Sequence, residues 1–295
     1  MTVLLTPAKR GVHAMVAAVA PAAAGRWATD AFSRTRALGV YPDNVLPLGA
    51  TAFEVTGNPD VQRGYLWGTG GPVALLVHGW GADSSSMYSL IPTLRALGYT
   101  VAAFDAPGHG ICAGNQATMT QYTDAATAVL RTLGGVRVVI AHSLGSIAAV
   151  GALGRVGTDD LDCLALVAPT CTLGGVLERW RPAGFSVSRP VVERIYRELH
   201  RRNGVPVTHW DISTLGAGFD RPVLVIHDPD DPVVPFGEAE LVAAALRDCR
   251  LVAADGGGHA AILMSPQLKR LLTEFIGEHA WIDHGAGGLL ESEAP

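Results

Sequence analysis

Charged residues are scarce in this sequence: they make up 17% of its 295 residues, whereas hydrophobic residues make up 48%. Chains that are too polar to bury a core remain disordered, so this composition excludes a disordered protein and predicts a packed globular one. The sequence also lacks a long basic run, and its formal net charge is -5, which argues against a nucleic-acid partner. Its length suffices for one large domain with a sizeable core.

Cysteine is scarce as well, and the four cysteines do not show the close paired spacing of a metal site. We therefore expect no metal centre. Cys163 and Cys171 are close enough in sequence to approach each other, but the set favours a reduced chain in the cytoplasm.

The apolar run at 12–24 is too short to span a bilayer, so we expect no transmembrane segment. Two basic residues precede it and the alanines at 22–24 resemble a cleavage site, which outlines a secretory signal. However, the run is dominated by alanine, lacks leucine and is interrupted by Pro21. We therefore favour a packed helix, or one in peripheral contact with a membrane. In the alternative, residues 1–24 are a signal peptide and the protein is exported.

From residue 50 onward, segments typical of strands alternate with segments typical of helices. Two β-type segments, 50–57 and 61–68, lie between turn residues and predict a hairpin. Repeated β-α units then predict an α/β fold, with a mainly parallel sheet covered by helices on both faces. Further strands are predicted at 73–77, 100–104, 136–141, 163–167, 222–226 and 250–253. Helices are predicted at 26–38, 86–97, 120–133, 238–246 and 263–276.

One stretch combines a buried strand, a tight turn and a helix. Residues 136–141 are apolar and rich in β-branched side chains, and the residues from Leu144 to about Gly154 are helix-prone. The turn between them reads Ala141-His142-Ser143-Leu144-Gly145. A serine at the apex of such a turn projects its hydroxyl from the carboxyl edge of the sheet, at the positive end of a helix.

This stretch resembles the nucleophile elbow of the α/β-hydrolase family, G-x-S-x-G, with Ser143 as nucleophile. Ala141 stands where the first glycine is expected, and its methyl group predicts a local adjustment of strand or helix. The resemblance covers about 50–277, because a D-x-P-G-x-G turn that starts at Asp105 and the loops described next follow in the family's order. It implies an α/β-hydrolase fold, a triad in the order Ser, acid, His, and no cofactor.

The acid is expected after the predicted strand at 222–226, where an acidic turn delivers carboxylates to the carboxyl edge of the sheet. The family pattern at this turn is H-G-x-x-D-x-x-V-P. Alignment of His227 and Val234 with it places the acid at Asp231, while Asp228 replaces the usual glycine. Asp230 is the competing acid. A solvated turn of ordinary turn-forming residues is the alternative, but it does not account for the register with His227.

The base is expected at His259, in a glycine-rich loop after the last predicted strand, which is the family's position for it. His279 and His284 lie in or beyond the final helix and would point away from the sheet edge. Two backbone N–H groups are expected to stabilise the oxyanion, those of Leu144 and of Trp80 in the turn His78-Gly79-Trp80-Gly81. Asp105 and His109 are expected to be structural.

One long segment interrupts the alternation of strands and helices. Between 168 and 221 no strong strand occurs, and an amphipathic helix is predicted at 191–202. In the family a cap occupies this position, so we expect a helical cap at about 169–220 that shapes the substrate pocket. A surface helical elaboration is the alternative. The side chains expected to bind substrate are Trp180, Ile195, Tyr196 and Trp210.

These patterns predict an N-terminal helical segment (1–45), an α/β-hydrolase domain (46–285) and a tail (286–295). The resemblance implies a serine hydrolase that cleaves a carboxylic ester of a small-molecule acyl substrate through an acyl-enzyme on Ser143. An acyltransferase or thioesterase with the same triad is the nearest alternative, and a non-catalytic binding protein is a more distant one. The sequence does not determine the oligomeric state.

Overall fold

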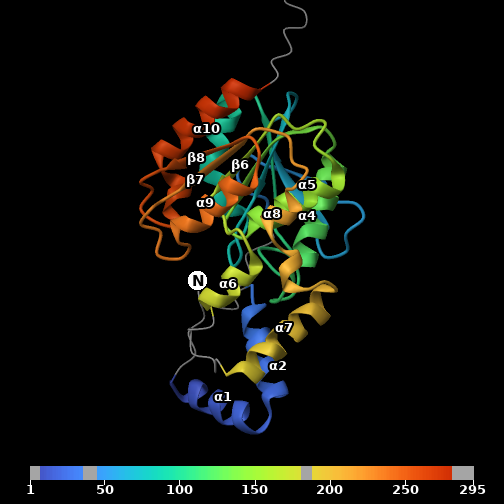
Figure 1. The fold of residues 1–295 in the computed structure, drawn as a ribbon. Coiled ribbons are helices and arrows are strands. Elements are labelled where there is room, and N and C mark those ends of the chain that lie inside the picture. The colour runs from blue at the N-terminus through green and yellow to red at the C-terminus, as the bar shows by residue number, and fades with distance from the viewer. Residues whose placement is uncertain (1–6, 36–44, 181–187, 281–295) are drawn as a thin grey trace, which may run out of the picture.

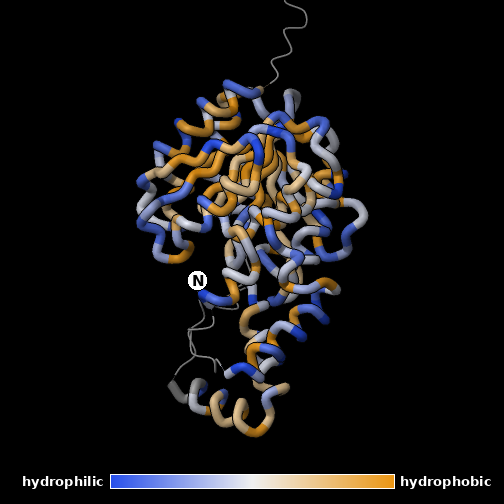
Figure 2. The backbone as a smooth tube through the Cα atoms, in the orientation of Figure 1, coloured by the Kyte–Doolittle hydropathy of each residue, from blue (hydrophilic) through white to orange (hydrophobic). Residues whose placement is uncertain are grey.

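The computed structural model describes residues 7–35, 45–180 and 188–280. The predicted tail at 286–295 lies outside the described residues. Figure 1 shows an α/β body with a smaller group of helices beneath it. In Figure 2 the hydrophobic residues gather along the central strands, whereas hydrophilic residues follow the outer surface of the body.

Eight strands form one sheet in the order β1-β2-β4-β3-β5-β6-β7-β8. The first two strands pair antiparallel, as the predicted hairpin requires, and β2 is antiparallel to β4. All later pairs are parallel. The strands are β1 (Thr51–Glu54), β2 (Arg63–Trp67), β3 (Val73–Val77), β4 (Thr100–Phe104), β5 (Val136–His142), β6 (Cys163–Val167), β7 (Val223–His227) and β8 (Cys249–Ala253).

Helices cover both faces of the sheet, because successive side chains of a strand point to opposite faces. In β6, for example, Leu164 and Leu166 belong to one buried cluster and Cys163 and Ala165 to the other. The first cluster includes α4 (Met119–Leu133), α5 (Gly145–Val156) and α9 (Phe236–Ala245), and the second includes α3 (Ile91–Ala96) and α10 (Pro266–His279). The α/β fold predicted from the alternating pattern is thus confirmed.

Prolines divide three segments that the sequence pattern predicted as continuous helices. Pro21, Pro92 and Pro266 each stand in the first turn of a new helix, where a missing N–H costs no hydrogen bond. The predicted run at 12–24 therefore splits between α1 (Pro7–Val19) and α2 (Pro21–Phe32). The predicted helices at 86–97 and 263–276 each begin as a short 3₁₀ helix, η1 (Ser84–Leu90) and η4 (Ala261–Met264), before α3 and α10.

The segment between β6 and β7 contains α6 (Leu173–Trp180), α7 (Arg189–Asn203), η3 (Val207–His209) and α8 (Ile212–Leu215). Its two ends are tied together, because Leu173 N–H donates to the Trp210 carbonyl and Ile212 N–H donates to that of Cys171. α8 joins the body of the domain, since Ile212 is buried in the core beside α5. In Figure 1, α6 and α7 extend away from the sheet instead.

The N-terminal helix α2 packs against α7, although the two are far apart in sequence (Figure 1). Gly25 allows this close approach, because a Cβ atom there would lie 2.4 Å from the Cβ of Arg194. The helix α1 exposes Val12, Met15 and Val19 to solvent. Peripheral contact with a membrane through this helix stays a prediction.

Three chemical features of the described residues complete the fold. No helix among them is long and apolar enough to cross a membrane. No cluster of three or more histidine, cysteine or acidic side chains among them is arranged to hold a metal ion. The four cysteines are free thiols, and the nearby pair Cys163 and Cys171 forms no disulfide.

Candidate active site

The chain turns sharply from β5 into α5 at Ser143, whose φ of 55° is unusual for a residue other than glycine. Hydrogen bonds hold this conformation: Ser143 N–H donates to the Val167 carbonyl, and Ser146 N–H donates to the Ser143 carbonyl, each at 3.0 Å. Gly145 is required, because a Cβ atom there would lie 2.3 Å from the His78 carbonyl oxygen. The turn therefore presents the Ser143 hydroxyl at the carboxyl edge of the sheet.

Ala141 does not disturb the strand before this turn. It is fully buried and pairs in regular register with Val77 of β3 and Leu166 of β6. The register shift between β3 and β5 lies at the opposite end, between Val73 and Ala74. Of the adjustment predicted for strand or helix, the strand shows none, because the methyl group fits within the regular ladder.

Three side chains form a hydrogen-bonded line at this edge. His259 Nε2 lies 2.9 Å from Ser143 Oγ, and His259 Nδ1 lies 2.7 Å from Asp231 Oδ2. The three residues follow β5, β7 and β8 in the chain. Parallel strands bring their carboxyl ends to the same edge, so residues distant in sequence meet there.

Asp231 is buried and accepts several hydrogen bonds. Its Oδ1 accepts the N–H groups of Val233 at 2.7 Å and Val234 at 3.0 Å, and His227 Nε2 lies 3.3 Å from Oδ2. Burial alone would raise the pKa of Asp231, but the bonds from His227, His259 and the two N–H groups outweigh it. The pKa of Asp231 is therefore well below its ordinary value, and the carboxylate is ionised at neutral pH.

Two backbone N–H groups flank Ser143 without partners among the described residues, those of Trp80 and Leu144. Both residues line the same pocket as Ser143. Gly79 permits the close approach of the Trp80 turn, because a Cβ atom there would lie 3.1 Å from the Ser143 Cβ.

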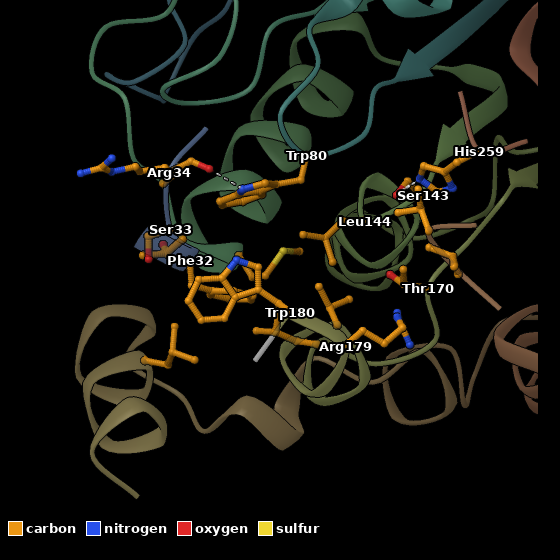
Figure 3. Close-up of a pocket in the computed structure, with 18 of the residues that line it drawn as sticks. Phe32, Ser33, Arg34, Trp80, Ser143, Leu144, Thr170, Arg179, Trp180 and His259 are labelled. Atoms are coloured by element: carbon orange, nitrogen blue, oxygen red, sulfur yellow. Dashed lines mark hydrogen bonds between the residues drawn. The ribbon is translucent and has the colours of Figure 1, made fainter. Parts of the chain in front are cut away.

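Side chains around the Trp80 turn hold it in place. The Trp80 indole Nε1 donates to the Arg34 carbonyl at 3.0 Å (Figure 3). The indole and the His109 ring pack edge to face, with centroids 5.1 Å apart. His109 accepts the Gly81 N–H, and Asp105 accepts the N–H of Ser84. Asp105 and His109 thus bond to backbone groups of this loop, as structural residues do.

Asp228, which stands where the family has glycine, joins the loop of Asp231 to the loop of His259. Its Oδ1 accepts the Asp230 N–H at 2.9 Å, and its Oδ2 accepts those of Gly256 at 3.1 Å and Gly258 at 2.7 Å. These bonds, chiefly that from Asp230, lower the pKa of Asp228. The aspartate in place of glycine is visible in the sequence, but this bridge is not, because its glycine partners lie 28 and 30 positions downstream.

His142 also contacts the loop of His259. Its Nε2–H donates to the His259 carbonyl at 2.9 Å. Burial, with a smaller contribution from His259, lowers the pKa of His142 to about 3, so the ring is neutral at neutral pH. No local pattern in the sequence marks His142, because its partner lies 117 positions downstream.

A pocket of about 520 Å³ opens beside Ser143 and His259. This volume is typical of a small-molecule site. The pocket is also lined by residues from the predicted cap and from the N-terminal segment (Figure 3). The main apolar contributors are Ala31, Phe32, Trp80, Met119, Leu144, Leu173, Val176, Trp180 and Leu199, and the polar ones include Thr170, Arg179 and Asn203.

Of the four side chains predicted to bind substrate, Trp180 lines this pocket and the other three do not. Ile195 is buried on the face of α7 that contributes to the core, and Tyr196 is partly buried against that core. Trp210 is almost fully buried beneath the base of the insertion. The predicted amphipathic face exists and packs mostly against protein; of its buried residues Val191, Ile195 and Leu199, only Leu199 lines the described pocket.

Comparison with known proteins agrees with this architecture. A model of the Alpha/beta hydrolase family matches residues 74–268. Among solved structures, an esterase from Pyrococcus furiosus superposes with a TM-score of 0.62 at 19% identity, covering 84% of this chain and 97% of that one. No curated protein gives a significant sequence match.

Two further solved structures share the fold. Alpha/beta hydrolase domain-containing protein 10 from mouse superposes with a TM-score of 0.60 at 17% identity, covering 78% of this chain and 97% of that one. A hydrolase from Oleispira antarctica gives 0.55 at 19% identity, with 72% and 94% covered. Because the family model matches most of the chain, including the strands that carry Ser143 and Asp231, this chain belongs to the alpha/beta hydrolase family.

Proposed function

We propose that this hydrolase cleaves carboxylic esters of small to medium organic molecules through an acyl-enzyme on Ser143. The observation that carries the proposal is the line from Ser143 through His259 to Asp231. Ser143, at one end of this line, borders a pocket of about 520 Å³. The P. furiosus relative is named an esterase, which agrees with ester cleavage but at 19% identity supports the fold alone.

The tautomer of His259 follows from its partners. An ionised carboxylate only accepts hydrogen bonds, so the Nδ1 that faces Asp231 carries the proton. Nε2 then has a free lone pair and accepts the hydroxyl proton of Ser143. The proposed base is thus oriented to activate the serine as it attacks the acyl carbon.

Attack moves an electron pair onto the carbonyl oxygen of the ester, where the Trp80 and Leu144 N–H groups would stabilise it. Collapse of this intermediate expels the alcohol, which takes the proton from His259 Nε2. Water then attacks the acyl-enzyme, with His259 again as base, and releases the acid and the free Ser143. No step in this sequence requires a metal or an organic cofactor.

A fluorophosphonate probe tests the proposed nucleophile directly. We expect covalent labelling of the native protein, with the adduct on the peptide that contains Ser143 by mass spectrometry. An unrelated serine hydrolase provides the positive control for the probe. Failure of the native protein to label under these conditions would favour a binding protein that shares the fold.

Hydrolysis and acyl transfer share this acyl-enzyme, so they are separated by product analysis. With an activated ester and a competing primary alcohol in water, a hydrolase releases mainly the free acid. Mainly transesterified product at a low alcohol concentration would identify an acyltransferase instead. Parallel thioester substrates show whether the leaving group must be an alcohol.

Asp228→Asn should lower kcat/KM by about 10- to 100-fold, the scale expected when a reacting group is misplaced by about 1 Å. Asp228 Oδ2 accepts the N–H groups of Gly256 and Gly258, and an asparagine NH2 group in its place could not accept them. The loop that ends in His259 should then shift. Kinetics on an acetate ester and the melting temperature are measured together.

The control for this prediction is Asp230→Asn, because Asp230 is exposed on the same turn and only its N–H contacts Asp228. We expect this variant to resemble the wild type. Fluorophosphonate labelling should slow in Asp228→Asn but still reach completion, since Ser143 is intact. Wild-type kcat/KM in Asp228→Asn would show that the bridge does not position His259.

A further inference from the structure

The pocket extends from the triad toward the N-terminal segment. In Figure 3, Ser143 and His259 lie at one end and Phe32 and Trp180 at the other, with Leu144 between them. Phe32 is the last residue of α2, and Trp180 is the last residue of α6. Their rings meet edge to face, with centroids 5.2 Å apart and planes at 73°. Together these two rings line the end of the pocket opposite Ser143.

The polar side chains near this end are mostly engaged with the protein. Asn203 donates from Nδ2 to the Leu199 carbonyl and accepts the Thr120 N–H at Oδ1. Arg179 Nη1 pairs with Glu238 at 2.5 Å, whereas Arg179 Nη2 and Thr170 Oγ1 are buried without a hydrogen-bond partner among the described residues. In Figure 3 the Arg34 side chain points away from the pocket. The surfaces left for a ligand between Leu144 and the two rings are therefore mainly apolar.

Specific bonds fix the end of α2 in this position. Asp30 forms an ion pair with Arg202 of α7 at 2.5 Å, and its carbonyl accepts the Gln116 amide. The Ser33 carbonyl accepts the Ala117 N–H at 3.1 Å. The Arg34 carbonyl accepts the Trp80 indole N–H, so the same segment also holds the turn that provides a proposed oxyanion donor. Bonds of residues before and after Phe32 in the chain thus fix the end of α2.

We infer that the pocket binds one extended apolar chain of the ester, and that Phe32 sets the length of that chain. The inference rests on the proposed ester hydrolysis. It assigns a role in substrate selection to the N-terminal segment, which lies outside the residues 74–268 matched by the family model. Moving an apolar chain from water into the pocket lowers its free energy. A chain that already reaches the two rings cannot extend further, so additional methylenes would bring no further gain.

Chain-length profiles test this inference on the full chain. One series of 4-nitrophenyl esters varies the acyl chain from acetate through butyrate, hexanoate, octanoate and decanoate to dodecanoate. A second series varies the alcohol of acetate esters over the same lengths. In one of the two series, kcat/KM should rise about fourfold per buried methylene until the chain reaches Phe32, and then fall.

Phe32→Ala should move the optimum of that series toward longer chains by roughly two methylenes or more, since the ring occupies several methylenes' volume. The readout is the position of the optimum within the series, which does not depend on the overall rate of the variant. Phe32→Trp should shorten the optimum. Phe32→Leu, a milder truncation, gives the same direction if the alanine variant folds poorly.

The matched control is Phe219→Ala. Phe219 is buried in the same core cluster but does not line the pocket. The Phe219→Ala variant should have a lower melting temperature than the wild type but the same dependence of kcat/KM on chain length. An unchanged optimum in all three Phe32 variants, each shown to be folded by its melting temperature, would overturn the inference alone. If the wild type hydrolyses no ester in either series and is not labelled by the fluorophosphonate probe, the proposed function itself is overturned.

Discussion

Ser143→Ala should lower kcat/KM for an acetate ester by about 10⁴- to 10⁶-fold, the scale observed when a triad nucleophile is removed. The hydroxyl oxygen is the atom that would form the bond to the acyl carbon, and His259 has nothing to activate without it. The remaining rate would come from the oxyanion donors and the bound water alone.

Alanine should be tolerated in the fold, because it retains the Cβ atom and the backbone that holds the turn. The strained φ of 55° at this position is supported by the bonds to Val167 and Ser146 rather than by the hydroxyl. We therefore expect a melting temperature close to that of wild type. Near-native turnover in this variant, with contaminating esterase excluded by a mock purification, would show that Ser143 is not the nucleophile.

Asp231→Asn should lower kcat by about 10⁴-fold while the protein remains folded. The amide that replaces the carboxylate favours the wrong tautomer of His259, in which Nδ1 accepts and Nε2 carries the proton. Nε2 could then no longer take the proton of Ser143. The loss should appear mainly in kcat, because Asp231 acts on the base and the substrate need not contact it.

Asp230→Asn is again the matched control, since it makes the same chemical change one residue earlier at an exposed position. It should alter kcat/KM by no more than about twofold. Circular dichroism and the melting temperature establish that both variants fold. Equal losses in the two variants, or a larger loss in Asp230→Asn, would contradict the assignment of Asp231 as the acid.

Local patterns in the sequence were sufficient to predict most strands, and the resemblance to the family supplied the expected order of the site residues. Alternating apolar runs and helix-prone segments predicted the mainly parallel sheet, because side-chain periodicity is a local property of the chain. The spacing of His227, Asp231 and Val234 placed one carboxylate of an acidic turn in line with the family pattern. In the structure it is this carboxylate, and not that of Asp230, that meets His259.

The breaks at Pro21, Pro92 and Pro266 show where local reasoning was incomplete. Proline lacks the N–H that continues a helix, and it restricts the residue before it. The apolar periodicity ran through Pro92 and Pro266, so the predicted helices did too, whereas Pro21 already interrupts its run in the sequence. The prolines were visible in the sequence, but whether each begins a new helix or interrupts one depends on the packing around it.

Packing between segments distant in the chain determined the rest. The apolar face of α7 was predicted correctly, but a face does not specify its partner, and Ile195 packs into the core rather than lining the described pocket. Only the tertiary structure brings Phe32 to Trp180 and Asp228 to the loop of His259. The sequence by itself thus determined the strands, the elbow and the order of the site residues. The tertiary structure decided the pocket, because its walls come from segments whose contacts leave no local pattern.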